Sequence, residues 1–197
     1  MPTGLLDDFN RADQTSGLLG TDWNVNINAG THTNHDILVN QCKADAGAFS
    51  SNWWTTRFGV DQEASAIIVA TPTTGSFRLY ARLGDPGTTR AFGYELEITA
   101  TDSFISKAIA PSFTRTSLLT LGVMFGSGNK ARLRCVGTTI SAWRDTGSGY
   151  TQVGSVTDTA IPTDGYIGIW TENNAVTVID DFTGGDFQAG ISYTAKR

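Results

Sequence analysis

The architecture follows from two stretches: residues 76–83, Ser-Phe-Arg-Leu-Tyr-Ala-Arg-Leu, and residues 92–99, Phe-Gly-Tyr-Glu-Leu-Glu-Ile-Thr. Apolar and polar side chains alternate in both, which is typical of a β-strand with one buried face. The set expected to face the core is Leu79, Ala81, Leu83, Tyr94, Leu96 and Ile98, and the set expected to face outward is Arg78, Tyr80, Arg82, Glu95, Glu97 and Thr99. We expect a hairpin that places Arg78 opposite Glu97 and Tyr80 opposite Glu95. Opposite charges on facing strands stabilise such a register by roughly 0.2–1 kcal/mol per pair.

The same alternation recurs along the chain between turns rich in Gly, Asn, Asp and Thr. The further strands expected are 5–9, 23–28, 36–43, 62–70, 104–109, 118–124, 130–136, 139–145, 151–157, 166–171 and 176–183. No long segment has the i, i+3, i+4, i+7 spacing of an amphipathic helix. Many short strands without helices predict an all-β fold, a two-sheet antiparallel jelly-roll sandwich.

A second hairpin is expected to turn at Gly137-Thr138. It places Arg134 opposite Ser141 and Arg132 opposite Trp143, so that the Arg132 guanidinium covers the Trp143 indole. Such a cation–π contact is worth roughly 0.5–1 kcal/mol at an exposed site. The side chains expected to face the core are Ala131, Leu133 and Cys135.

Length and composition predict one domain. The 197 residues are 40% hydrophobic and 17% charged, which suits a folded core and argues against disorder. We expect the sandwich to occupy residues 1–183 and residues 184–197 to be a C-terminal tail or an extra strand. The net charge of -5 argues against a nucleic-acid partner.

No apolar run approaches the ~20 residues of a membrane helix. The opening residues, Met1-Pro2-Thr3-Gly4-Leu5-Leu6-Asp7-Asp8, lack the features of a secretory signal peptide. These observations predict no transmembrane segment and no signal peptide, and they leave a cytoplasmic location open. Two cysteines, Cys42 and Cys135, do not make a disulfide framework, and buried free thiols are favoured over a bridge.

The order of several short motifs resembles the laminin-G-like branch of the concanavalin A-like lectin/glucanase superfamily over about residues 5–183. The matching segments are 7–11 (Asp-Asp-Phe-Asn-Arg), 18–23, 61–66, 79–82, 94–96, 132–140, 164–169 and 180–182. The opening Asp-Asp-Phe-Asn-Arg is also similar to proteins encoded in tailed-phage structural gene blocks. The resemblance implies a jelly roll, location in a virion, and other virion proteins or a cell-surface glycan as partners.

Glucanases of this superfamily carry acidic residues in alternation on one strand, as Glu-x-Asp-x-Glu, because glycoside hydrolysis needs two carboxyl groups. Here Glu95 and Glu97 fill two positions and Thr99 fills the third. Arg78, expected opposite, would keep a carboxylate ionised rather than available as an acid. We therefore expect no catalytic residues.

Metal-binding patterns are weak, and no cofactor is expected. The segment 32–36, His-Thr-Asn-His-Asp, is better explained as a polar loop than as a metal site. The residue pairs Asp7-Asp8 and Asp180-Asp181 would come together if the terminal strands are neighbours. A structural calcium held by Asp8 and Asp181 is then an alternative to ordinary strand-edge aspartates.

Aromatic and charged residues supply the ligand-binding candidates. Trp53 and Trp54 are adjacent on an expected loop, 48–58, so one of them is either exposed as a ligand platform or buried by a curled loop. Trp23 and Trp170 are expected in the core. The expected outward face gathers Arg78, Tyr80, Arg82, Glu95, Glu97, Arg132, Arg134 and Trp143. This face is either a groove for a polar, sugar-like ligand or a self-satisfied ion-pair network.

Three functions follow in order of preference. The first is a non-catalytic binding or structural module of a phage particle, as a decoration protein or in tail- or fibre-associated surface recognition. The second is a free carbohydrate-binding module. The third is a glycoside hydrolase.

Overall fold

Strands β7 (Ser76–Gly84) and β8 (Phe92–Thr99) form the expected antiparallel hairpin in the computed structural model of the chain. Arg78 lies opposite Glu97 and Tyr80 lies opposite Glu95, as the charges predict. The alternation of side chains along this hairpin therefore sets the register of the central strands.

Strands β11 (Lys130–Val136) and β12 (Thr139–Asp145) form the second hairpin. Their register places Arg132 opposite Trp143 and Arg134 opposite Ser141, which confirms that expectation. The described residues are 3–15, 19–30, 32–45, 49–172 and 177–188. Within them no helix is long and apolar enough to cross a membrane.

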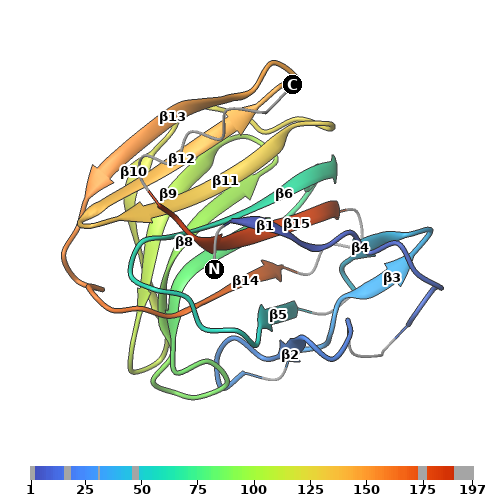
Figure 1. Ribbon diagram of the computed structural model, residues 1–197, viewed down its shortest axis with the longest axis horizontal. Helices are drawn as coiled ribbons and strands as arrows, with labels where there is room; N and C mark the ends of the chain where they lie inside the picture. Colours follow the sequence, from blue (N-terminus) through green and yellow to red (C-terminus); the bar gives the residue numbers. More distant parts are fainter. Residues whose placement is uncertain (1–2, 16–18, 31, 46–48, 173–176, 189–197) are drawn as a thin grey trace.

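An eight-stranded sheet forms one layer of the molecule (Figure 1). Its strands are β1 (Gly4–Asp7), β3 (Asp36–Leu38), β4 (Gln41–Lys43), β6 (Gln62–Ala70), β11, β12, β13 (Tyr150–Thr157) and β15 (Val178–Asp186). They run in the order β13-β12-β11-β6-β15-β4-β3, and β1 pairs with β15 beside this path.

A seven-stranded sheet forms the other layer. Its strands are β2 (Trp23–Val25), β5 (Ser50–Trp54), β7, β8, β9 (Ser103–Ile109), β10 (Thr114–Thr120) and β14 (Tyr166–Thr171), in the order β10-β9-β8-β7-β14-β5-β2. Among the described residues, the strand pairings in both sheets are antiparallel. The all-β jelly-roll sandwich predicted from the sequence is confirmed.

The core lies between the two sheets. Leu79 and Leu96 from one sheet and Leu133 from the other belong to a single buried cluster. Burying each such side chain stabilises the fold by about 1.5–3 kcal/mol. Cys42 and Cys135 are buried free thiols, as expected, and burial raises the pKa of Cys135 to about 12. A thiol in this environment is chemically inert.

The expected neighbourhood of the terminal strands is confirmed. β1 pairs with β15, with Leu5 opposite Thr183 and Asp7 opposite Phe182. Figure 1 shows blue β1 beside red β15 across the face of the eight-stranded sheet. The last strand runs to Asp186, three residues beyond the expected end at residue 183.

Several strand boundaries differ from expectation. The expected loop around Trp53 contains β5, which is paired on both sides by β14 and β2. The expected strand 36–43 is a hairpin of β3 and β4, because Val39 and Asn40 have φ values of 54° and 59°, which turn the chain. The strand expected at 118–124 is β10, which lies at Thr114–Thr120.

One β-bulge reverses the expected directions of Arg82 and Leu83. The register shifts between Ala81 and Gly84, and Arg82 has a φ of 50°. The backbone N–H of Arg82 donates to Gln62 Oε1 at 2.8 Å instead of continuing the ladder. Leu83, expected in the inter-sheet core, therefore packs in a separate apolar cluster that includes Tyr80.

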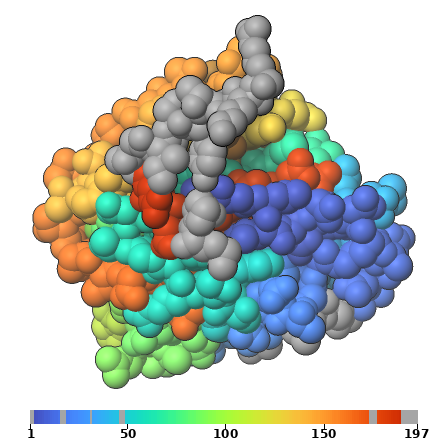
Figure 2. All heavy atoms as spheres, in the orientation of Figure 1, coloured from blue at the N-terminus to red at the C-terminus, as the bar shows by residue number. Residues whose placement is uncertain are grey.

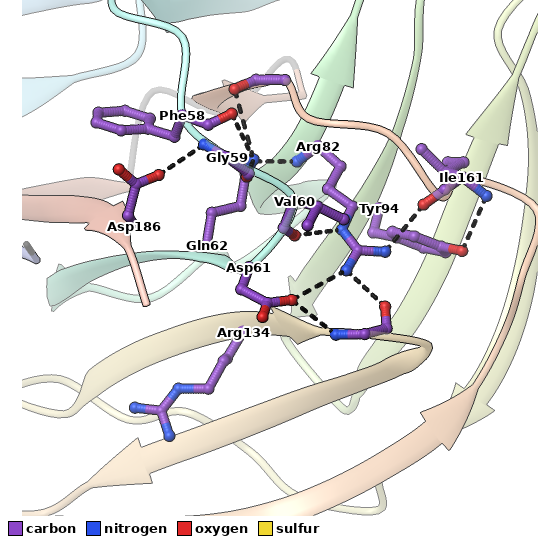
Figure 3. A network of polar contacts seen from close by, with 12 residues as sticks. Phe58, Gly59, Val60, Asp61, Gln62, Arg82, Tyr94, Arg134, Ile161 and Asp186 are labelled. Carbon is purple, nitrogen blue, oxygen red and sulfur yellow. Dashed lines mark hydrogen bonds and ion pairs between the residues drawn. The ribbon is translucent and has the colours of Figure 1, made fainter. Parts of the chain in front are cut away.

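The Arg82 side chain is turned inward and is 1% exposed (Figure 3). Its guanidinium donates to three backbone carbonyl oxygens: to Val60 at 2.7 Å, Ile161 at 2.9 Å and Gly137 at 2.6 Å. The expectation that Arg82 faces outward with Arg78 and Tyr80 is wrong. Arg82 joins segments of both sheets at one end of the sandwich.

Candidate functional site

The residues expected to form one binding face lie on opposite sides of the sandwich. Tyr80 belongs to β7 and Glu95 to β8, in the seven-stranded sheet, whereas Arg132 belongs to β11 and Trp143 to β12, in the eight-stranded sheet. The two sheets place their apolar faces together, so the outward side chains of one cannot meet those of the other. The expected single groove is therefore wrong, and each face must be considered separately.

The outer face of the seven-stranded sheet carries a closed ion-pair network. Glu95 accepts from Tyr80 Oη at 2.6 Å and from Arg115 Nε at 2.7 Å. Glu97 accepts from Arg78 Nη2 at 2.8 Å and pairs with Arg115 Nη2 at 2.7 Å. The Arg78 side chain is 1% exposed and the Glu95 side chain 0%. Of the two alternatives left open by the sequence, the ion-pair network describes this group, with Arg78 Nε as a buried donor that lacks a hydrogen-bond partner.

This network does not suit the two carboxylates to acid–base catalysis. Burial disfavours the charged form of Glu97, yet hydrogen bonds from Arg115 and Arg78 outweigh it and lower the Glu97 pKa. A glycosidase needs one carboxyl group protonated near neutral pH. Both oxygens of Glu95 are already engaged by Tyr80 and Arg115. The arrangement holds charges in place rather than transferring protons.

Aromatic rings cover the same sheet next to the network. Trp170 stacks on Phe113, with ring centroids 5.9 Å apart and planes 5° apart, and packs near Tyr80. Arg78 lies over the Trp170 ring at 5.6 Å. Trp170, expected in the core, is buried as expected, but in the second apolar cluster on the outer side of one sheet.

Trp53 and Trp54 point to opposite sides of β5. Trp54 is buried in the inter-sheet core and meets Trp23 edge-on at 5.3 Å, so the expectation of a core position for Trp23 is confirmed. Trp53 is half-buried and packs against Tyr166, with ring centroids 4.7 Å apart. The two tryptophans therefore cannot act as a single platform.

The candidate metal residues do not gather into a ligand set. Among the described residues, no group of three or more His, Cys, Asp or Glu side chains is placed to hold a metal ion. Asp8 is exposed and Asp181 half-buried. His35 instead hydrogen-bonds Asn52 Oδ1 at 2.8 Å and the Thr171 hydroxyl, which makes it part of the packing.

The outer face of the eight-stranded sheet has two arginine–aromatic contacts. Arg134 lies over Trp143 at 4.9 Å, and Arg132 lies over Tyr150 at 3.6 Å. The expected stack of Arg132 on Trp143 is wrong. Arg132 lies over Tyr150 of β13, and Arg134 occupies the face of the Trp143 indole. Trp143 Nε1 donates to Ser141 Oγ at 2.9 Å. Both aromatic rings are half-buried.

A groove of about 310 Å³ lies on this outer face. It is lined by Leu5, Ser65, Ala66, Ile67, Lys130, Arg132, Tyr150, Asp181 and Thr183. The lining combines an aromatic ring, two cations, one carboxylate and two hydroxyl groups, and the hydroxyls of Ser65 and Thr183 are hydrogen-bonded to each other. Figure 2 views this side, where the dark-blue N-terminal strand lies beside red β15.

Some residues that line the groove were candidate site residues in the sequence analysis, and others were not. Arg132 was expected as a ligand residue and Asp181 as a metal residue, whereas Tyr150, Lys130 and Ser65 were missed as site residues. Tyr150 follows the turn Gly147-Ser148-Gly149 and lies opposite Asp145 in the β12–β13 pair. Extending the hairpin alternation across this turn would have placed its ring beside the arginines.

No protein-family model and no curated protein matches the sequence. Solved structures match its fold. A carbohydrate-binding module, CBM66 from Bacillus subtilis, has a TM-score of 0.63 and 14% identity over 84% of this chain and 96% of that chain. The VIP36 exoplasmic/lumenal domain, bound to Ca²⁺ and Man3GlcNAc, has a TM-score of 0.63 and 11% identity over 87% and 86%.

The CBM2 module of the evolved Dit protein of Lactobacillus casei BL23 phage J-1 is also similar, with a TM-score of 0.54 and 10% identity over 90% of this chain and 91% of that chain. At these identities the similarity concerns the fold. The chain shares the two-sheet jelly-roll fold of these structures.

Proposed function

We propose that the protein is a non-catalytic glycan-binding module and that the groove on the eight-stranded sheet is its binding site. The observation that carries this proposal is the composition of the groove around Tyr150 and Arg132. An aromatic ring packs against the apolar face of a sugar, while guanidinium, ammonium, carboxylate and hydroxyl groups bind its hydroxyls. The lining residues supply all of these groups within about 310 Å³.

The neighbouring solved structures support the proposal, because two are described as carbohydrate-binding modules and one as a mannose-containing glycan complex. The non-catalytic part is supported by the pairing of Glu95 and Glu97 with arginines. Those carboxylates also lie on the sheet opposite the groove, so they do not face a sugar bound there.

A glycan array probed with the purified protein and two tyrosine variants tests the proposal. Tyr150→Ala removes the ring in the groove and should reduce binding at least tenfold. Tyr166→Ala removes a half-buried ring of the seven-stranded sheet and should leave glycan binding unchanged. Trp143→Ala should weaken binding only modestly, because this indole is not among the groove-lining residues.

Two results would overturn the proposal. One is a blank array obtained with protein whose circular dichroism spectrum and melting curve show it to be folded. The other is glycan binding that survives Tyr150→Ala but is lost in Tyr166→Ala, which would move the site to the opposite face.

A finer proposal concerns the biological setting: a laminin-G-like module carried on a phage particle, as decoration or in tail- or fibre-associated recognition of a cell-surface glycan. The opening Asp7-Asp8-Phe9-Asn10-Arg11 and the fold shared with a module of a phage Dit protein support it. Mass spectrometry of gradient-purified particles should then detect this chain. Its absence from particles, with the chain present in the lysate, would leave the free carbohydrate-binding module as the better description.

A further inference from the structure

We infer that the groove recognises its glycan through an anionic group, a carboxylate or a phosphate, which pairs with Arg132. The inference rests on the proposed function and specifies the ligand class of the same groove. It follows from one property of Arg132: this guanidinium is held in position without hydrogen-bonding partners among the described residues.

Arg132 makes no hydrogen bond to a described residue, whereas Arg11 and Arg78, whose Nε atoms are also buried without a hydrogen-bond partner, donate through their Nη atoms. The Nε of Arg132 is buried without a hydrogen-bond partner, and its Nη1 lies 3.7 Å from Glu63 Oε2, beyond hydrogen-bond distance. That same Glu63 oxygen accepts from Arg134 Nε at 2.6 Å. The Glu63 carboxylate is therefore hydrogen-bonded to Arg134, and the N–H groups of Arg132 remain without an acceptor among the described residues.

The two fully buried arginines among the described residues donate hydrogen bonds, although the Nε of Arg78 has no partner. Arg82 donates to three carbonyl oxygens, and Arg78 donates to Glu97 and Glu172. Leaving a buried donor unsatisfied costs free energy, and more for a charged group than for a neutral one. A ligand that satisfies Arg132 recovers this energy on binding.

The Tyr150 ring orients the guanidinium. Arg132 lies 3.6 Å from the ring centroid, and its side chain is 18% exposed, so it is accessible from the groove. A planar guanidinium pairs with a carboxylate or a phosphate through two parallel N–H···O bonds. Tyr150 thus acts both as a wall for the sugar ring and as the support for the anion-binding group.

The charge of the lining favours an anion over a neutral sugar. Lys130 and Arg132 are two cations facing one carboxylate, Asp181, in the groove. Asp145, the cross-strand partner of Lys130, accepts hydrogen bonds from the backbone N–H groups of Gly147 and Gly149 at 2.7 and 2.9 Å. In a chain of net charge -5, this groove is a local cationic site. Asp181 remains available to accept from sugar hydroxyls.

Calorimetry with paired ligands tests the inference. The carboxylate arm compares oligogalacturonate, oligoglucuronate and sialylated oligosaccharides with the same glycans methyl-esterified at the carboxyl group. The phosphate arm uses a glycerol phosphate oligomer. At least one anionic probe should bind at least tenfold more tightly than its masked or uncharged counterpart. The arm that binds identifies the anionic group.

Variants locate the contact. Arg132→Gln should reduce binding of the anionic probe at least tenfold, and Arg132→Lys should recover part of it. Arg90→Gln, at a side chain 81% exposed and outside the groove, should leave binding unchanged. Thermal melting of each variant confirms that the protein is folded.

The outcomes separate this inference from the proposed function. Neutral glycans that bind in a Tyr150-dependent manner, with no preference for anionic probes, would overturn the inference and keep the function. Equal binding of the anionic and the uncharged probes in both arms, or anion binding unaffected by Arg132→Gln, would overturn it too. Failure of every glycan, anionic and neutral, to bind folded protein overturns both.

Discussion

Arg82 and Tyr94 meet inside the sandwich, with the guanidinium carbon 6.0 Å from the ring centroid. Tyr94 faces the core by the regular alternation of β8, whereas Arg82 arrives there through the bulge in β7. The Tyr94 hydroxyl also accepts from the backbone N–H of Ile161 at 3.2 Å, and Ile161 O accepts from Arg82. A charged residue thus completes the hydrogen bonds of loops that close one end of the core.

Arg82→Met should destabilise the protein by about 3 kcal/mol or more. The methionine keeps the approximate volume but leaves three carbonyl oxygens without their donor, and each such loss costs roughly 1–3 kcal/mol. Urea unfolding measures the change. Arg90→Met, at a side chain 81% exposed, is the matched control and should change stability by less than about 0.5 kcal/mol. Equal effects of the two substitutions would contradict the role assigned to Arg82.

Glu95→Gln should also be costly, at about 3 kcal/mol, because it removes a buried carboxylate that faces Arg78 and Arg115. Asp164→Asn is its control: the Arg57–Asp164 pair is as short, at 2.7 Å, but its side chains are 53% and 50% exposed. Removing an exposed pair costs about 1 kcal/mol or less. If the two variants unfold at the same denaturant concentration, the buried network on the seven-stranded sheet stabilises the protein no more than an exposed ion pair does.

His35 should make stability fall in acid. Burial lowers its pKa to about 4 from 6.5, although the Asn52 hydrogen bond opposes this. Below pH 6.5 the unfolded chain therefore takes up a proton that the folded chain refuses, and stability decreases until about pH 4. The full loss is about 3 kcal/mol from this group.

Carboxylates also titrate in this range, so the comparison must be differential. His35→Gln removes the titration, and the difference in unfolding free energy between pH 7 and pH 4.5 should be smaller in the variant than in the wild-type protein. Parallel pH profiles for the two proteins would show that His35 is not the group responsible.

The adjacent tryptophans should respond differently to truncation. Trp54→Ala opens a cavity beside Trp23 in the core and should cost about 3–5 kcal/mol. Trp53→Ala removes a half-buried ring that packs on Tyr166 and should cost less than about 2 kcal/mol. Thermal denaturation followed by near-UV circular dichroism distinguishes them, and a larger effect at Trp53 would reverse the assignment.

Local patterns predicted much of this fold. Facing charges in β7 and β8 predicted the register of Arg78 with Glu97, and alternation alone placed Leu133 in the core. Both features depend only on residues that belong to the same hairpin. The period of two in a strand is strong enough to determine them without knowledge of the rest of the chain.

The candidate binding surface was harder to predict because it depends on contacts between distant segments. Alternation says which residues face outward but not on which sheet, so Arg132 and Glu95 were grouped although they lie on opposite sides. The inward turn of Arg82 depends on Gln62, twenty residues away, which accepts its backbone N–H. The groove itself needs β15 beside β6, a long-range pairing that no local pattern encodes.

The alternation of β11 has an evolutionary consequence. Leu133 and Cys135 lie in the core, while Arg132 and Arg134, which alternate with them along the strand, lie on the opposite surface. Mutations at the even positions change the side chains on the outer surface, while the odd positions preserve the folded scaffold. The outer side chains of such a strand are therefore free to change independently of the core, so chains that share this architecture need not share its surface chemistry.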